Sequence, residues 1–135
     1  MPTIVPFYAA LLAALYIFLS VRVIRMRVGN RIGLGDGSNP RLQRAIRVHA
    51  NFSEYVPLAL ILTVFVEMQH SAPALVHALC LSLLVGRVIH SYAVSEEKED
   101  VRLRVAGMIL TCVTLGGAAL RLLGGFLFDR NCVAS

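Results

Sequence analysis

The sequence predicts an all-α integral membrane protein built as a bundle of four transmembrane helices. Hydrophobic residues make up 57% of the 135-residue chain and charged residues only 16%, which is too apolar for the water-covered surface of a soluble domain. The apolar residues form four long runs, each long enough for a helix to cross a bilayer. We therefore expect a single domain over residues 1–135, with helices over residues 4–27, 40–69, 74–94 and 101–128.

The first apolar run, residues 4–21, contains no charged residue, and Arg22, Arg25 and Arg27 follow it. A cleaved signal peptide would carry basic residues before its apolar run. The segment is therefore expected to remain as the first transmembrane helix. Its three arginines are expected at the membrane interface, where long side chains can extend toward water.

Turn residues separate the predicted helices. Residues 29–40 (GNRIGLGDGSNP) are rich in Gly, Asn and Asp, which favour turns, and they lack the Lys-Ser/Thr of a phosphate-binding P-loop. Residues 71–73 and the charged residues 95–100 form the other two turns. In the fourth helix, the glycine pairs 116–117 and 124–125 should let a neighbouring helix approach closely.

Five polar side chains of the second helix share one face. Arg44, Arg47, Asn51, Glu54 and Tyr55 fall within an arc of roughly a hundred degrees when the segment is wound as an α-helix. Ionisable groups at membrane depth cost free energy unless they are paired or line a wet cavity. This face is therefore expected to look inward, toward a ligand or other helices. A purely structural set of salt bridges is the alternative.

Two later segments carry further candidates. On the third helix, Arg87, His90 and Val94 share a face. On the fourth helix, Arg102 and Arg104 stand on opposite sides, so that one of the two can face the second helix. We choose Arg104 and keep Arg102 as the alternative. The face of Arg104 continues toward the interior through Gly107, Met108 and Thr111.

Six positions of the second helix and the segment GRVIH, residues 86–90, form a recognisable pattern; the six positions are Arg44, Arg47, His49, Asn51, Glu54 and Pro57. At these residues the chain resembles the MAPEG family (membrane-associated proteins in eicosanoid and glutathione metabolism). The resemblance covers most of the chain in the order of its helices, and implies a homotrimer in a lipid bilayer, here the bacterial inner membrane, with glutathione sites between subunits. It also implies a glutathione S-transferase or peroxidase-like enzyme of detoxification that acts on apolar electrophiles or lipids from the bilayer.

The resemblance also implies roles for single residues. Arg104 is expected to be catalytic by stabilising the glutathione thiolate, which is the nucleophile. The family commonly carries a tyrosine where this chain has Val94, which puts in doubt a role for a phenol there. His49 lies off the second-helix face and is included because it is one of the six positions that resemble the family. The expected glutathione-binding residues are Arg27, Arg44, Arg47, His49, Asn51, Glu54, Tyr55, Arg87 and His90.

Glutathione suits these side chains physically. Its two carboxylates seek arginines, its ammonium group seeks a carboxylate such as Glu54, and its amides seek a group such as Asn51. Two other functions stay open. A non-catalytic lipid- or thiol-binding protein of the same family needs no thiolate, and a small transporter would carry ionisable groups near the membrane midplane, whereas here they gather at one end.

Neither nucleic acid nor metal is expected as a partner. The chain carries a net charge of +5, but it has no basic stripe interleaved with aromatic residues, as nucleic-acid surfaces have. Cys80, Cys112 and Cys132 show no CxxC or other metal-like spacing.

The positions of the basic residues predict the orientation in the membrane. All but two of the 13 Lys and Arg residues fall at one end of the predicted bundle, the exceptions being Arg121 and Arg130. The cytoplasmic ends of membrane proteins carry the excess of Lys and Arg. We therefore expect the site at the cytoplasmic end and both termini on the non-cytoplasmic side.

Cysteine labelling in intact cells tests this orientation. A membrane-impermeant thiol reagent should label Ser135→Cys and leave Ser95→Cys unlabelled, because the two positions are predicted on opposite sides of the membrane. The unsubstituted chain gives the background from the native cysteines. Equal labelling of both variants from outside would contradict the predicted topology.

Overall fold

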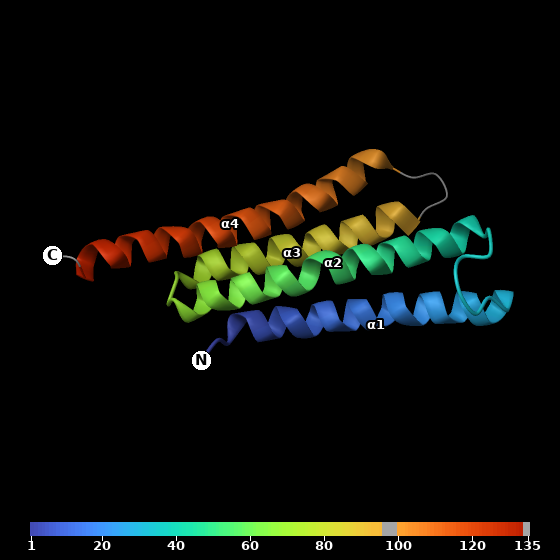
Figure 1. The fold of residues 1–135 in the computed structure, drawn as a ribbon, viewed down its shortest axis with the longest axis horizontal. Helices are drawn as coiled ribbons and strands as arrows, with labels where there is room; N and C mark the ends of the chain where they lie inside the picture. Colours follow the sequence, from blue (N-terminus) through green and yellow to red (C-terminus); the bar gives the residue numbers. More distant parts are fainter. Residues whose placement is uncertain (96–99, 134–135) are drawn as a thin grey trace.

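The structure, a computed structural model, describes residues 1–95 and 100–133, with side chains as far as residue 127 in the last helix. Its helices are α1 (Ile4–Asn30), α2 (Pro40–Met68), α3 (Pro73–Ser95) and α4 (Val101–Val133), and each is long and apolar enough to cross a membrane. They alternate in direction, so that the N-terminus and the end of α4 lie at the same end of the bundle (Figure 1). The predicted four-helix all-α membrane fold is confirmed. Helices α1 and α4 extend beyond the expected ends at residues 27 and 128.

Polar side chains fix where two of the helices begin. The side-chain oxygen of Asn39 accepts hydrogen bonds from the backbone N–H groups of Arg41 (3.0 Å) and Leu42 (3.2 Å), and Pro40 follows in the first turn, where a missing N–H group costs nothing. Asp100 accepts two backbone hydrogen bonds of 2.9 and 3.4 Å at the start of α4 in the same way. These caps define where α2 and α4 begin, about one turn before Arg44 and Arg104 of the predicted site.

Glu67, near the end of α2, caps the beginning of α1. Its carboxylate accepts hydrogen bonds from the backbone N–H groups of Thr3 (2.6 Å), Ile4 (2.7 Å) and Val5 (2.9 Å). The first N–H groups of a helix have no partner inside the helix and carry partial positive charge, so a carboxylate is a favourable partner. The contact joins α1 to α2 at the end of the bundle away from the predicted site.

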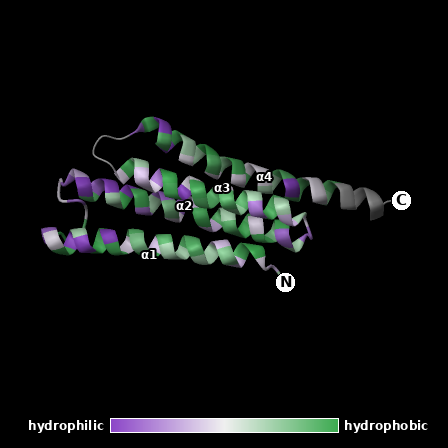
Figure 2. Cartoon of the chain, turned by 180° about the vertical axis from the view of Figure 1, so that it is seen from behind, coloured by the Kyte–Doolittle hydropathy of each residue, from purple (hydrophilic) through white to green (hydrophobic). Residues whose placement is uncertain are grey.

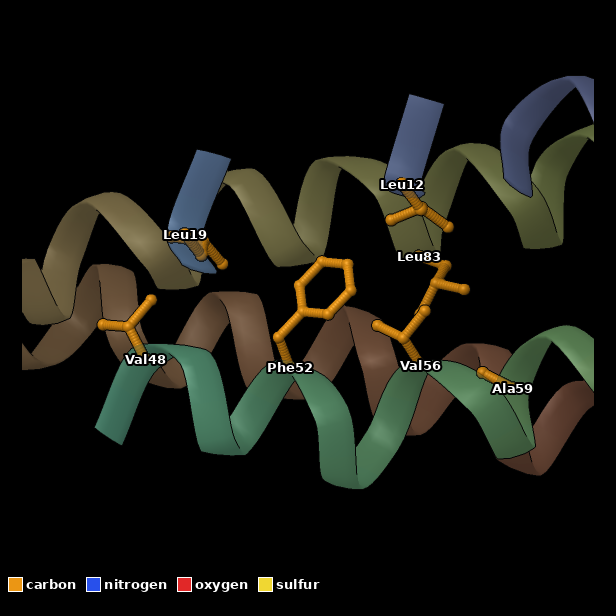
Figure 3. Close-up of a cluster of buried hydrophobic side chains, with 7 residues drawn as sticks. All are labelled: Leu12, Leu19, Val48, Phe52, Val56, Ala59 and Leu83. Atoms are coloured by element: carbon orange, nitrogen blue, oxygen red, sulfur yellow. The ribbon is translucent and has the colours of Figure 1, made fainter. Parts of the chain in front are cut away.

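Helices α2 and α3 lie between α1 and α4 (Figure 1). Within the described residues, α1 packs on α2 and α3, and α4 packs on the same two helices, but α1 and α4 do not pack against each other. Figure 3 shows a core cluster in which side chains of α1, α2 and α3 meet. It consists of Leu12, Leu19, Val48, Phe52, Val56, Ala59 and Leu83.

Large apolar side chains also cover the outside of the bundle. Phe7, Phe18, Phe65 and Phe126 are between 50% and 63% exposed, and so much exposed apolar surface on four helices of membrane length fits contact with lipid tails. Polar residues gather instead at the end of the bundle that carries the α1–α2 connection (Figure 2). The hydropathy pattern therefore separates a lipid-facing body from one polar end.

Helices α3 and α4 approach each other closely at Gly86 and Gly107. A Cβ atom on Gly86 would lie 2.9 Å from the carbonyl oxygen of Gly107, and one on Gly107 would lie 2.7 Å from the carbonyl oxygen of Gly86. Two interhelical hydrogen bonds lie on the side of this crossing away from the α3–α4 connection, donated by the hydroxyl groups of Ser82 (3.0 Å) and Thr114 (3.1 Å) to backbone carbonyls of the facing helix. Small residues and hydroxyl groups are the usual means by which helices associate in lipid.

The expected close approach at the glycine pairs further along α4 is wrong for two of the four glycines. A Cβ atom on Gly116 or Gly124 would meet nothing within 4 Å, and one on Gly117 would meet only the Leu79 side chain, at 3.2 Å. Adjacent residues of a helix point in different directions, so a pair of glycines cannot present both members to one neighbour. The contact between the two backbones is made at Gly107 instead.

Substitution of Gly107 tests this crossing. Gly107→Ala should lower the melting temperature of the detergent-solubilised protein, because the added methyl group must push α3 and α4 apart, and overpacking of this kind typically costs about 1–3 kcal/mol. Gly116→Ala is the matched control on the same helix. It should leave the melting temperature unchanged or raise it slightly, since Ala favours a helix by about 1 kcal/mol over Gly. Equal melting temperatures for the two variants would contradict the assigned contact.

Candidate functional site

A polar cavity lies between α2, α3 and α4 at the polar end of the bundle. Beyond the crossing at Gly107, the first turns of α4 diverge from α3 toward the α3–α4 connection (Figure 1), and the cavity occupies this part of the bundle. Its volume is about 460 Å³, within the range of pockets that bind small molecules. The residues that line it are Gln43, Arg44, Arg47, Asn51, His90, Val94, Arg104 and Met108.

Helical periodicity explains why these side chains meet. Positions three, four or seven residues apart lie on one face of a helix, and this spacing joins Arg44, Arg47 and Asn51 on α2, as it joins Arg104 to Met108 on α4. The second-helix face predicted from the sequence therefore supplies the α2 wall. The structure adds Gln43, one turn before Arg47 on the same side of α2, and this polar position at helical spacing is a signal that sequence reasoning missed.

Positive charge gathers in the cavity lining. Arg44, Arg47 and Arg104 supply three guanidinium groups, and the lining residues that the structure describes include no Asp or Glu. Guanidinium groups form strong, often bidentate hydrogen bonds with carboxylates and other anions. The cavity therefore suits a ligand that carries at least one carboxylate.

Arg102 and Arg104 are both exposed, but of the two Arg104 alone lines the cavity. Arg104 and Met108 also line a second cavity, of about 550 Å³, on the outer face of α4. The other residues that line this second cavity are Val105, Ile109, Cys112 and Val113. The two cavities thus share Arg104 and Met108, which stand between a polar compartment and an apolar one.

Two predicted binding residues, Glu54 and Tyr55, lie at the two opposite edges of the α2 face. Glu54 is exposed and does not line the cavity. Tyr55 lies on the opposite edge and is half-buried, with its ring centroid 5.8 Å from the guanidinium carbon of Arg87. That distance is within the range of a cation–π contact. In this chain Tyr55 therefore packs against a neighbouring side chain outside the cavity lining.

Arg87 lies behind the cavity wall and does not line the cavity. It is 1% exposed, and its guanidinium group donates hydrogen bonds through Nη1 to Asn51 Oδ1 (2.8 Å) and through Nη2 to the Gly107 carbonyl oxygen (3.5 Å). The Nη2 atom also lies 3.4 Å from the sulfur of Met108. A single side chain of α3 thus joins α2 to α4 beside the cavity.

His49 and Arg27 are placed away from the cavity in this chain. The His49 ring faces α1, where its Nε2 atom lies 3.0 Å from the hydroxyl oxygen of Ser20 and its ring stacks on Tyr16 at a centroid distance of 4.9 Å. Arg27, near the end of α1, donates a hydrogen bond of 3.4 Å to the carbonyl oxygen of Gly33. Helix α1 supplies no residue to the cavity lining.

Comparison with known proteins places the chain in a family. A sequence model of the MAPEG family matches residues 5–124. The inner membrane protein YecN of Escherichia coli strain K12 is 42% identical over 85 residues, and the YecN of Escherichia coli O6:H1 strain CFT073 matches with the same identity. These matches span 63% of this chain and 65% of each relative, just under two thirds of their length. The family match extends from the first turn of α1 into the last part of α4, and the chain belongs to the MAPEG family.

Proposed function

We propose that the protein is a membrane-embedded glutathione transferase with peroxidase-like capacity, which holds glutathione as a thiolate and presents it to apolar electrophiles from the bilayer. The observation that carries this proposal is the position of Arg104, which lines both the cationic cavity and the apolar cavity on the outer face of α4. A thiolate beside Arg104 would lie where a water-soluble ligand and a lipid-soluble one can meet.

The charges of the cavity support glutathione as the ligand. Its two carboxylates fit the guanidinium groups of Arg44 and Arg47, and its peptide groups fit hydrogen bonds with Asn51. Glu54 lies one turn beyond Asn51 at the exposed edge of the same helix. We expect the ammonium group of glutathione to lie toward this edge, because none of the described lining residues carries a carboxylate.

The chemistry follows from the charge of Arg104. A guanidinium group beside the sulfur favours the thiolate over the thiol, and so lowers the pKa of the bound thiol while its proton passes to water. The thiolate then forms a carbon–sulfur bond with the electrophile, and the leaving group departs with the electron pair of the broken bond. With a lipid hydroperoxide, the thiolate attacks the terminal peroxide oxygen, the O–O bond breaks, and the lipid alkoxide leaves and takes up a proton to become the alcohol. The sulfenic acid of glutathione then reacts with the thiol of a second glutathione to give the disulfide and water.

Because Val94 lines the cavity, we expect Arg104 to contribute more to the stabilisation of the thiolate. The side chain of Val94 lines the cavity at the position where the family commonly carries a tyrosine, and an apolar side chain cannot donate a hydrogen bond to sulfur. The stabilisation of the thiolate therefore rests on charge, which acts more strongly at the membrane boundary than in bulk water.

We also propose that the protein forms a homotrimer in the bacterial inner membrane. Helix α1 packs on α2 and α3 but does not pack against α4 within the described residues, and it adds nothing to the cavity lining. Arg27 of α1 can therefore serve as a glutathione ligand if it belongs to a neighbouring subunit. We place the site at the cytoplasmic end, where the basic residues gather.

A non-catalytic lipid-binding protein of the same family is the second candidate. A groove of about 400 Å³ between α1 and α2 favours it, because the groove is apolar and lies away from the arginines. The residues that line the groove are Ala9, Leu12, Ala13, Tyr16, Phe52, Ser53, Val56, Pro57 and Leu60. Such a protein would bind its ligand without forming a thiolate, so one measurement separates the two functions.

Ultraviolet difference spectroscopy of the purified protein with glutathione makes that measurement. The wild type should show thiolate absorbance at neutral pH, and Arg104→Leu should abolish it, because the charge beside the sulfur is removed. Arg102→Leu is the matched control, since it removes the same charge from an exposed position outside the cavity lining.

Two results would go against the proposal. If the wild type binds glutathione without thiolate absorbance, the catalytic proposal fails and the binding-protein function takes its place. If Arg102→Leu abolishes the signal and Arg104→Leu does not, the enzyme stands but Arg104 is not its catalytic residue.

A further inference from the structure

Arg87 is the largest fully buried side chain among the described residues, with 1% of its surface exposed. Among the described residues, the contacts of the Arg87 guanidinium group are with an amide oxygen, a backbone carbonyl, a thioether and an aromatic ring, and none of them is a carboxylate. Its Nε atom donates no hydrogen bond to any described residue. A buried charge without an opposite charge is costly, and within a membrane helix such a residue usually serves a function.

The guanidinium group of Arg87 contacts two residues of the cavity lining from the side away from the cavity. Asn51 on α2 and Met108 on α4 both line the cavity and both contact Arg87, which does not line it. The Gly107 carbonyl oxygen, its other partner on α4, lies three residues after Arg104 and at the crossing with α3. Arg87 thus stands at the point from which α2 and α4 are held relative to each other.

The bond to Asn51 also fixes which way its amide group points. A guanidinium group can only donate, so the Asn51 atom that faces Arg87 at 2.8 Å must be the oxygen. The NH₂ group of the amide is then left for the cavity as a donor. If Arg87 were absent, the amide would be free to rotate and present its oxygen, which repels an anionic ligand.

We infer that Arg87 is a positioning residue for the glutathione site, which orients the Asn51 amide as a donor and holds α4 at Gly107 and Met108. The inference rests on the proposed function and refines it, because it makes Arg87 act through Asn51 and α4 and not as a ligand. Lysine cannot replace it, since a single ammonium group lacks the planar fork that spans two partners. The Arg87→Lys variant therefore keeps the charge and removes the positioning.

The first experiment needs no ligand. The four methionines are labelled with ¹³C in their methyl groups, and the Met108 resonance is assigned by its loss in Met108→Leu. In the absence of glutathione, Arg87→Lys should shift the Met108 methyl resonance, because its sulfur lies 3.4 Å from Nη2, and should leave Met68, at the opposite end of α2, unchanged. An unchanged Met108 resonance would overturn the inference for α4.

The second experiment is a double-mutant cycle on the glutathione dissociation constant, measured by isothermal titration calorimetry. Asn51→Ala and Arg87→Lys should each weaken binding about tenfold, as the loss of one strong hydrogen bond does. The double variant should bind no more than about twofold more weakly than either single variant, because the two residues act as one unit. Independent losses that multiply to about a hundredfold would make Arg87 a direct ligand and overturn the inference.

The Asn51→Asp variant tests whether glutathione binding needs the Asn51 amide as a donor, even if Arg87→Lys does not fold. The new carboxylate can pair with Arg87, so the oligomer should stay intact, but it presents no donor to the cavity, and glutathione binding should fall by more than tenfold. Binding equal to that of the wild type would show that the orientation of the amide does not matter, which contradicts the inference. If the wild type itself binds no glutathione, the proposed function fails, and the Met108 resonance still decides whether Arg87 holds α4.

Discussion

The close crossing of α3 and α4 at Gly86 and Gly107 is the constraint on which the candidate site depends. Lipid tails are as apolar as the helices themselves, so helices in a membrane associate through close packing and interhelical hydrogen bonds. At this crossing the two backbones come so close that neither glycine has room for a methyl group. Helix α4 diverges from α3 beyond the crossing (Figure 1), and the side chains of α2, α3 and α4 there enclose a cavity in place of a packed core.

A second constraint is the cost of polar groups where water is absent. Several polar side chains within the helices have partners elsewhere in the bundle: Glu67 accepts hydrogen bonds from three backbone N–H groups, His49 lies beside Ser20, and the Nη atoms of Arg87 bond to Asn51 and to the α4 backbone. The cavity lining concentrates three guanidinium groups, and none of its described residues is an Asp or Glu. This concentration of positive charge is the physical basis of the proposed anionic ligand.

The sequence predicts the fold well because lipid imposes length and hydropathy on each helix. It also predicts the α2 wall, since helical periodicity brings Arg44, Arg47 and Asn51 onto one face. Periodicity does not say which neighbouring helix meets that face. Periodicity also could not show that Arg87 lies behind the cavity lining or that Glu54 lies at the exposed edge of the α2 face. Nor could it show which glycines of α4 contact α3. All three depend on how separate helices are rotated against each other.

The central claim is that glutathione binds in the cationic cavity with its sulfur beside Arg104. Cryo-electron microscopy of the protein in lipid nanodiscs with glutathione tests it most directly. The account predicts a trimer with tripeptide density against Arg44, Arg47 and Asn51, and with the sulfur next to Arg104 at the opening of the apolar cavity on α4. Density for the sulfur away from Arg104, or a cavity that stays empty at saturating glutathione, would contradict the account.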